Sequence, residues 1–193
     1  MTVLSVFVPC QRVCADQTPA QYSVTAWGHK DGLPSTFIYA IAQTADGFLW
    51  LGTGDGLVRF DGVQFTPWHT MQPDEAPLGE VHALRACSGG DLLVGTGTGT
   101  LGRLHGGQMK TAQLHAGVEW IEEARDGSLW VATSKAVWHV DGANLASMDP
   151  PIALLGDWLS GPLEGDDGWQ WITTRKGVFR VGARNGLVPA GAR

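Results

Sequence analysis

The chain has 193 residues, a net charge of -6, 44% hydrophobic and 17% charged residues, a balance typical of a globular protein rather than a disordered one. No Lys/Arg cluster occurs, which argues against a nucleic-acid partner, and no apolar run reaches the roughly 18 residues of a membrane span. The 27 Gly and 9 Trp residues together indicate many short strands joined by tight turns.

The first fifteen residues have some features of an export signal. Residues 2–8 form a short apolar stretch, and Val13, Cys14 and Ala15 resemble the small-residue site at which a signal peptide is cleaved. The positively charged segment that normally precedes the apolar stretch is missing. Residues 1–15 are therefore expected to be either the remnant of a signal peptide or a disordered leader.

Four similar segments follow along the chain. They read DGFLWLGTGDGLVRFDG at 46–62, GDLLVGTGTGTLGRLHG at 90–106, DGSLWVATSKAVWHVDG at 126–142 and DGWQWITTRKGVFRVGA at 167–183. The units repeat at about 40 residues, which is the period of a four-stranded β-propeller blade. The sequence therefore predicts an all-β protein built from blade repeats.

The first unit shows how such a blade would form. Residues 38–42 give an inner strand, 48–52 and 57–60 the next two, and 64–68 the fourth, with Asp-Gly turns at 46–47 and 61–62. The strands are apolar on both faces, as a sheet packed between two others requires. Trp50, Trp130 and Trp171 recur at one repeat position and are expected to pack between blades.

The repeats divide the chain into units near 38–68, 81–109, 118–145 and 159–184, within a propeller region of residues 21–184 and before a tail at 185–193. Loops are expected at 69–80 and 148–158. Pro162 removes a backbone donor, so the inner strand of the fourth unit should be weak or irregular. About four blades would form either an open, partial propeller or a small closed one.

Motifs for catalysis, metal or cofactor binding find little support. Residues 97–102 match G-x-G-x-x-G, yet no helix is expected after them. The six His residues lack metal-site spacing, and Cys87 is expected to be a small buried apolar residue. Glu119 and Glu122 are the carboxylates considered for hydrolysis, but a solvated or channel-lining role is favoured. We therefore expect no catalytic residue, metal or cofactor.

Residues 27–34 and 41–53, together with the G-L-x-R-F-D-G segment at 56–62, resemble the two-component regulator propeller family. The hallmark of that family is W-x-x-x-D-G-L-P, then A-Q-T-x-D-G followed by an aromatic residue and L-W-(aliphatic)-G-T. The resemblance covers about residues 21–182 and weakens toward the fourth unit. It departs from the family in that the chain shows no membrane helix and no kinase segment.

The resemblance implies a periplasmic or extracytoplasmic input region of a membrane-anchored sensor, such as a histidine kinase or a diguanylate cyclase. It further implies that the chain is non-catalytic, is part of a longer signalling protein, takes a saccharide or other small ligand, and can form a homodimer. Two alternatives stay open: a protein-interaction scaffold and a propeller-fold carbohydrate-active enzyme.

Exposed aromatic rings are the usual platforms for sugar rings. Four tryptophans fall outside the recurrent packing position and are the predicted ligand-binding residues: Trp27, Trp68, Trp120 and Trp158.

Overall fold

The computed structural model describes residues 23–74, 76–142, 144–149, 151–153, 158–182 and 186–189, with residues 158–160 and 186–189 described as backbone only. The predicted leader at 1–15 lies outside the described residues. The described strands form four antiparallel sheets of four strands each, which we call blades 1 to 4. The predicted all-β, propeller-type fold with four repeats is confirmed.

Each blade is a meander in which consecutive strands pair. Blade 1 contains β1 (Ile38–Gln43), β2 (Leu49–Thr53), β3 (Gly56–Phe60) and β4 (Phe65–Pro67). Blade 2 contains β5 (Val81–Ala86), β6 (Leu92–Thr96), β7 (Thr100–His105) and β8 (Gln108–Gln113). Blade 3 contains β9 (Val118–Glu123), β10 (Leu129–Thr133), β11 (Ala136–Val140) and β12 (Ile152–Ala153). Blade 4 contains β13 (Trp158–Glu164), β14 (Gln170–Thr174), β15 (Gly177–Gly182) and β16 (Gly186–Pro189).

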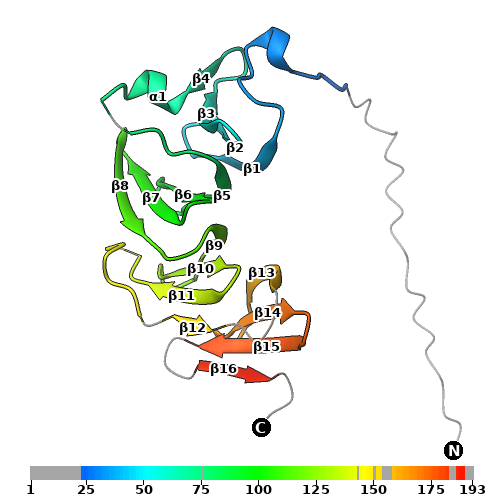
Figure 1. The fold of residues 1–193 in the computed structure, drawn as a ribbon, viewed down its shortest axis with the longest axis vertical. Helices are drawn as coiled ribbons and strands as arrows, with labels where there is room; N and C mark the ends of the chain where they lie inside the picture. Colours follow the sequence, from blue (N-terminus) through cyan, green and yellow to red (C-terminus); the bar gives the residue numbers. More distant parts are fainter. Residues whose placement is uncertain are drawn as a thin grey trace, which may run out of the picture.

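The four blades stand side by side along an arc (Figure 1). The inner strands β1, β5, β9 and β13 follow its concave side, where each contacts the next, and the fourth strands lie toward the outside. Blade 1 and blade 4 lie at opposite ends of the arc, so the ring is open. The short helices η1 (His29–Asp31) and α1 (Trp68–Met71) lie beside blade 1.

Two polar residues fix the turns of the repeat. The Asp of the Asp-Gly pair accepts a backbone N–H two residues on, as Asp126 Oδ1 does from Ser128 at 3.0 Å. The threonine that ends the second strand closes the next hairpin: Thr133 Oγ1 donates to the Ala136 carbonyl oxygen at 3.0 Å. Thr53, Thr96, Thr133 and Thr174 are all buried. The recurrent Asp and Thr residues are therefore structural.

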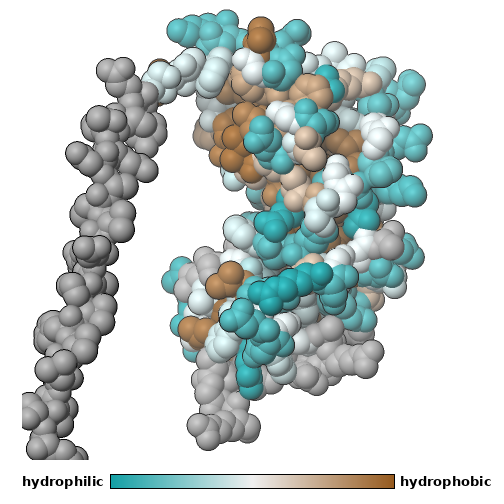
Figure 2. All heavy atoms as spheres, turned by 180° about the vertical axis from the view of Figure 1, so that it is seen from behind, coloured by the Kyte–Doolittle hydropathy of each residue, from teal (hydrophilic) through white to brown (hydrophobic). Residues whose placement is uncertain are grey.

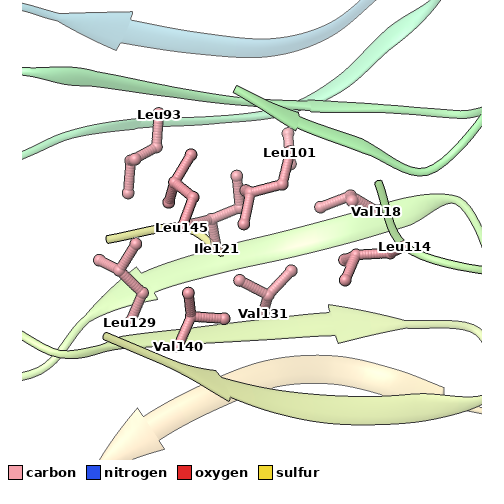
Figure 3. Close-up of a cluster of buried hydrophobic side chains, with 10 residues drawn as sticks. Leu93, Leu101, Leu114, Val118, Ile121, Leu129, Val131, Val140 and Leu145 are labelled. Carbon is pink, nitrogen blue, oxygen red and sulfur yellow. The ribbon is translucent and has the colours of Figure 1, made fainter. Parts of the chain in front are cut away.

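The core lies between the blades rather than within one. Side chains that point toward the preceding blade form the front face of a blade, and those that point toward the following blade form its back face. Between blades 2 and 3, Leu93 and Leu101 from the back face of blade 2 meet Ile121, Leu129 and Val131 from the front face of blade 3 (Figure 3). Apolar side chains on both faces of one strand satisfy two such interfaces, which explains the absence of apolar–polar alternation.

Some elements differ from the predicted boundaries. β12 lies inside the segment expected to be a loop, and β16 lies inside the expected tail, where it completes blade 4. The fourth strand of blade 1 ends at Pro67, and Trp68 begins the helical turn α1. The pairing of β13 with β14 shifts register before Ser160, as the other inner strands do at the same place, and once more between Ser160 and Leu163, as the proline at 162 predicts.

Candidate ligand site on the concave face

The inner strands of three blades line a hollow on the concave side of the arc. Its volume is about 380 Å³, and its lining comes from residues 39–41 of β1, 82–85 of β5 and 119–121 of β9. Figure 2, seen from behind, shows the molecule hollowed on this side, with hydrophobic surface gathered on the upper half of the arc, where blade 1 lies. The hollow mixes aromatic rings with charged groups, a lining that suits a polar ligand with apolar faces.

Trp120 of β9 presents an exposed ring to this hollow, with 41% of its surface accessible. The ring is backed by Gly161 of β13: a Cβ at that glycine would lie 2.3 Å from Trp120 Cε2. Only glycine permits so close an approach of the backbone to an indole. Blade 4 therefore supports the position of a side chain that belongs to blade 3.

An ion pair between two blades lies beside Trp120 at the hollow. Arg85 Nη2 of blade 2 lies 2.8 Å from Glu122 Oε1 of blade 3, and the Trp120 side chain donates a hydrogen bond to the Glu122 carboxylate. Burial raises the pKa of Glu122, while Arg85 and the Trp120 hydrogen bond act in the opposite direction. Glu123 faces a different partner, accepting the backbone N–H of Ser88 at 2.8 Å.

A second aromatic pair lies across the hollow. The rings of Tyr39 and His82 have centroids 4.5 Å apart at an angle of 52°. His82 Nε2 lies 3.2 Å from Glu80 Oε2, which orients the imidazole. The far side of the His82 ring rests on Gly97, where a Cβ would approach the ring to 2.9 Å. The hollow is thus lined by aromatic rings from three different blades.

The four predicted tryptophans lie in different surroundings. Trp120 lines the hollow. Trp27 is exposed but packs edge-on against Phe60 on blade 1, at 5.3 Å between centroids. Trp68 is buried beside Trp50, in the core between blades 1 and 2. Trp158 is the first residue of β13, and its side chain lies outside the described part of the structure. The structure thus brings Trp120 to the hollow and places Trp27 and Trp68 elsewhere.

The sequence analysis missed Tyr39, His82 and Arg85. Tyr39 and His82 share a signal, the repeat register: like Glu119, each follows the first residue of an inner strand, at a point where the pairing with the second strand is irregular. An irregularity re-aims side chains, and here these three line the hollow. Aligning the inner strands, instead of only the Asp-Gly turns, would have found the position.

The described residues were also compared with the requirements of a metal site, a reactive thiol and a membrane span. Within the described residues no group of three His, Cys, Asp or Glu side chains could hold a metal ion. Cys87 packs against the core between blades 2 and 3, and burial raises the pKa of its thiol to about 11. No helix in the described part of the chain is long and apolar enough to cross a membrane.

Comparisons with known proteins agree with the sequence motif and the fold. Residues 32–55 match the family described as Two component regulator propeller. No curated protein matches the sequence.

Among solved structures, the extracellular domain of a putative one component system from B. thetaiotaomicron superposes with a TM-score of 0.64 at 15% identity, over 84% of this chain and 23% of that one. The extracellular domain of a putative hybrid two component system from the same organism gives 0.63 at 15% identity, over 83% and 22%. A virginiamycin B lyase from Staphylococcus aureus gives 0.62 at 14% identity, over 83% and 59%. The chain thus spans less than two thirds of each of these proteins, and at such identities the likeness shows the fold alone.

The matched residues 32–55 include the first two strands of blade 1, the four blades share one strand order, and the same fold recurs in extracellular domains of signalling systems. The chain is a β-propeller protein in which residues 32–55 are similar to the two-component regulator propeller family.

Proposed function

We propose that this chain is a non-catalytic, ligand-sensing input region of a two-component-type signalling protein, that it acts outside the cytoplasm, and that its ligand is a saccharide. The family match and the fold shared with extracellular domains of signalling systems support the sensory role. The hollow on the inner strands supports the ligand class.

The observation that carries the proposal is the pairing of exposed aromatic rings with fixed polar groups in one hollow. Trp120 offers a flat apolar face, Tyr39 and His82 offer another, and Glu119 and Arg85 supply an acceptor and donors beside them. A sugar ring has apolar C–H faces and a rim of hydroxyl groups, so it suits this combination. Since residues from three blades form the hollow, a bound ligand would also change how those blades pack against one another.

Substituting Trp120 tests the site. We expect one oligosaccharide among cello-, xylo-, malto-, chito- and heparin-derived fragments to bind in isothermal titration calorimetry, and Trp120→Ala to weaken that binding by roughly tenfold or more, because a central aromatic anchor contributes on the order of 1.4 kcal/mol or above. The matched control is Trp27→Ala, which removes an exposed indole outside the hollow and should leave the affinity unchanged.

Three results would count against the proposal. If no fragment binds, a saccharide is not the ligand. If wild type and Trp120→Ala bind a fragment equally well, the hollow is not the binding site. Release of new reducing ends from a polysaccharide, abolished by Glu119→Gln, would favour the alternative of a carbohydrate-active enzyme.

A further inference from the structure

A second cavity, which we call the interblade cavity, lies between blades 1 and 2. Its volume is about 640 Å³, within the range of pockets that bind small molecules. It lies at the end of the blades that carries the turns 44–48, 87–91 and 106–107, and it shares no lining residue with the hollow on the concave side. The interblade cavity is therefore a separate place at which a ligand could bind.

The apolar part of its lining comes from both blades. It consists of side chains that are buried or half-buried: Trp50, Trp68, Met71, Leu92 and Leu104. The centroids of the Trp50 and Trp68 rings lie 6.3 Å apart, with an angle of 55° between the rings. Gln72, which follows α1, donates through Nε2 to the carbonyl oxygen of Gly107 at 3.1 Å and joins the two blades beside these side chains. This wall suits the apolar part of a ligand.

A chain of hydrogen bonds fixes an aspartate at the rim of the interblade cavity. Trp50 Nε1 donates to Thr44 Oγ1 at 3.1 Å, and Thr44 Oγ1 donates to Asp46 Oδ1 at 2.6 Å. The other oxygen of this carboxylate, Oδ2, has no hydrogen-bond or ion-pair partner among the described residues. Asp46 thus presents an oriented negative charge to the cavity. Blade 1 differs here from the other blades, in which the position of Thr44 is occupied by Cys87, Ala124 and Gly165.

An arginine of blade 1 also lines the cavity. Arg59 of β3 is paired in register with Trp50, so its side chain lies on the same face of the blade. Its guanidinium lies 4.4 Å from the centroid of the Phe48 ring, and it forms no hydrogen bond or ion pair within the described part of the chain. Its counterpart in blade 2 differs, since Arg103 Nε lies 3.7 Å from Asp91 Oδ2. An aromatic ring therefore holds the guanidinium of Arg59 while its N–H donors are free for a ligand.

Among the described residues, Asp46 and Arg59 bring opposite charges to one cavity without forming an ion pair with each other. Asp61 also experiences the charge of Arg59, but Asp61 Oδ1 accepts the backbone N–H groups of Val63 at 2.8 Å and Gln64 at 2.7 Å. A guanidinium binds a carboxylate in a geometry that matches its fork of donors, and a carboxylate binds an ammonium group. The lining thus suits a ligand that carries both charges and an apolar body.

We propose that the interblade cavity binds a small zwitterion of the amino-acid type with a large apolar side chain. The ammonium group of the ligand binds Asp46 Oδ2, its carboxylate binds the guanidinium of Arg59, and its side chain packs against Trp50 and Leu92. The ligand and the place both differ from those of the proposed saccharide site, so each site can be tested without the other.

Ligands that lack one charge test the proposal on the unaltered chain. In isothermal titration calorimetry at about pH 7, where a free amino acid carries both charges, at least one of L-phenylalanine, L-leucine and L-tryptophan should bind. The analogue of that amino acid without its amino group, and the analogue without its carboxylate, should each bind roughly tenfold or more weakly. Binding of none of the three amino acids would overturn the proposal, as would an affinity that does not change when either charge is removed.

Two variants assign the charges to their partners. Asp46→Asn, which keeps an oxygen for the hydrogen bond with Thr44, and Arg59→Gln should each weaken binding of the amino acid by roughly tenfold or more. Asp46→Asn should have no such effect on the analogue without its amino group, and Arg59→Gln none on the analogue without its carboxylate, because the interaction is already absent. Equal losses for all three ligands would mean that the variants act only through the fold, and would overturn the proposal.

The matched controls are Asp55→Asn and Lys110→Gln, which remove exposed charges outside the cavity and should leave the affinity for the amino acid unchanged. Trp120→Ala, which alters the hollow, should also leave it unchanged. Loss of amino-acid binding in Trp120→Ala would place the ligand in the hollow and overturn the proposal. Far-UV circular dichroism of each variant shows whether the blades are folded.

Discussion

Gln170 occupies a position at which the other three blades carry leucine. Leu49, Leu92 and Leu129 fill this place on the front faces of blades 1 to 3, each paired with the last residue of the inner strand. Gln170 is fully buried between blades 3 and 4, and neither atom of its amide has a hydrogen-bond partner among the described residues. A buried amide without partners costs free energy, so this residue weakens the junction of blade 4.

Replacing it should therefore stabilise the protein. We expect Gln170→Leu to raise the free energy of unfolding by about 1–3 kcal/mol, because the buried polar group is removed at nearly constant volume. Urea denaturation followed by circular dichroism measures the change. Gln108→Leu, at an exposed position of β8, should give no such gain. A loss of stability in Gln170→Leu would show that the amide makes a contact that the leucine cannot replace.

The tryptophans show what residue types alone can predict. Trp50 and Trp130 are buried between blades, as their recurrence predicts, and Trp171 at the same position is only half-buried because it lies on the open back face of blade 4. The sequence distinguishes Trp120 from them because its position does not recur in the repeat. The contact of its ring with Gly161 could not be predicted from the sequence, because it joins two blades and Gly161 lies where the pairing of β13 with β14 is irregular.

At the scale of the strand and its turn, the repeat is held by side chains that satisfy backbone groups. Thr133 Oγ1 donates to the carbonyl oxygen of Ala136 and accepts from its N–H at 3.1 Å, within a hairpin that contains no glycine. The hairpin of blade 3 is therefore the place to test how much the threonine hydrogen bonds stabilise the repeat.

We expect Thr133→Val to lower the free energy of unfolding by about 1–3 kcal/mol, since it leaves two backbone groups without their partner at a buried position. Thermal unfolding by calorimetry checks this. Thr111→Val, on the exposed surface of β8, should leave the midpoint unchanged. Equal midpoints for the two variants would mean that the threonine column does not hold the hairpins.

The elements themselves were predicted to different degrees. Inner, second and third strands follow from apolar runs between glycine-containing turns, most of them Asp-Gly pairs, and these strands formed as expected. The outer strands β12 and β16 were missed because they are short and lie in segments rich in Gly, Pro or charge. An outermost strand pairs along one edge only, so little in its own sequence needs to mark it.

For the whole molecule, the sequence predicts the repeat but leaves the closure of the ring open. Closure depends on the angle between successive blades, which arises from many side chains at each junction and has no local signature. The hollow on the concave side has the same origin, because Tyr39, His82 and Trp120 come together only through the stacking of three blades. Fold and repeat number were therefore accessible from sequence, while the composition of the site was not.

The central claim is that successive repeats stack face to face, so that the inner-strand residues of one blade are buried by the blade before it. A methyl NOESY spectrum of the chain tests this directly at Ile121, which lies 28 and 20 residues from Leu93 and Leu101 in sequence but packs with both in the core between blades 2 and 3. The structure predicts cross-peaks from the Ile121 δ1 methyl to the methyl groups of Leu93 and Leu101. Cross-peaks from Ile121 only to residues of its own blade would contradict the stacked arrangement, and with it the hollow on the concave face.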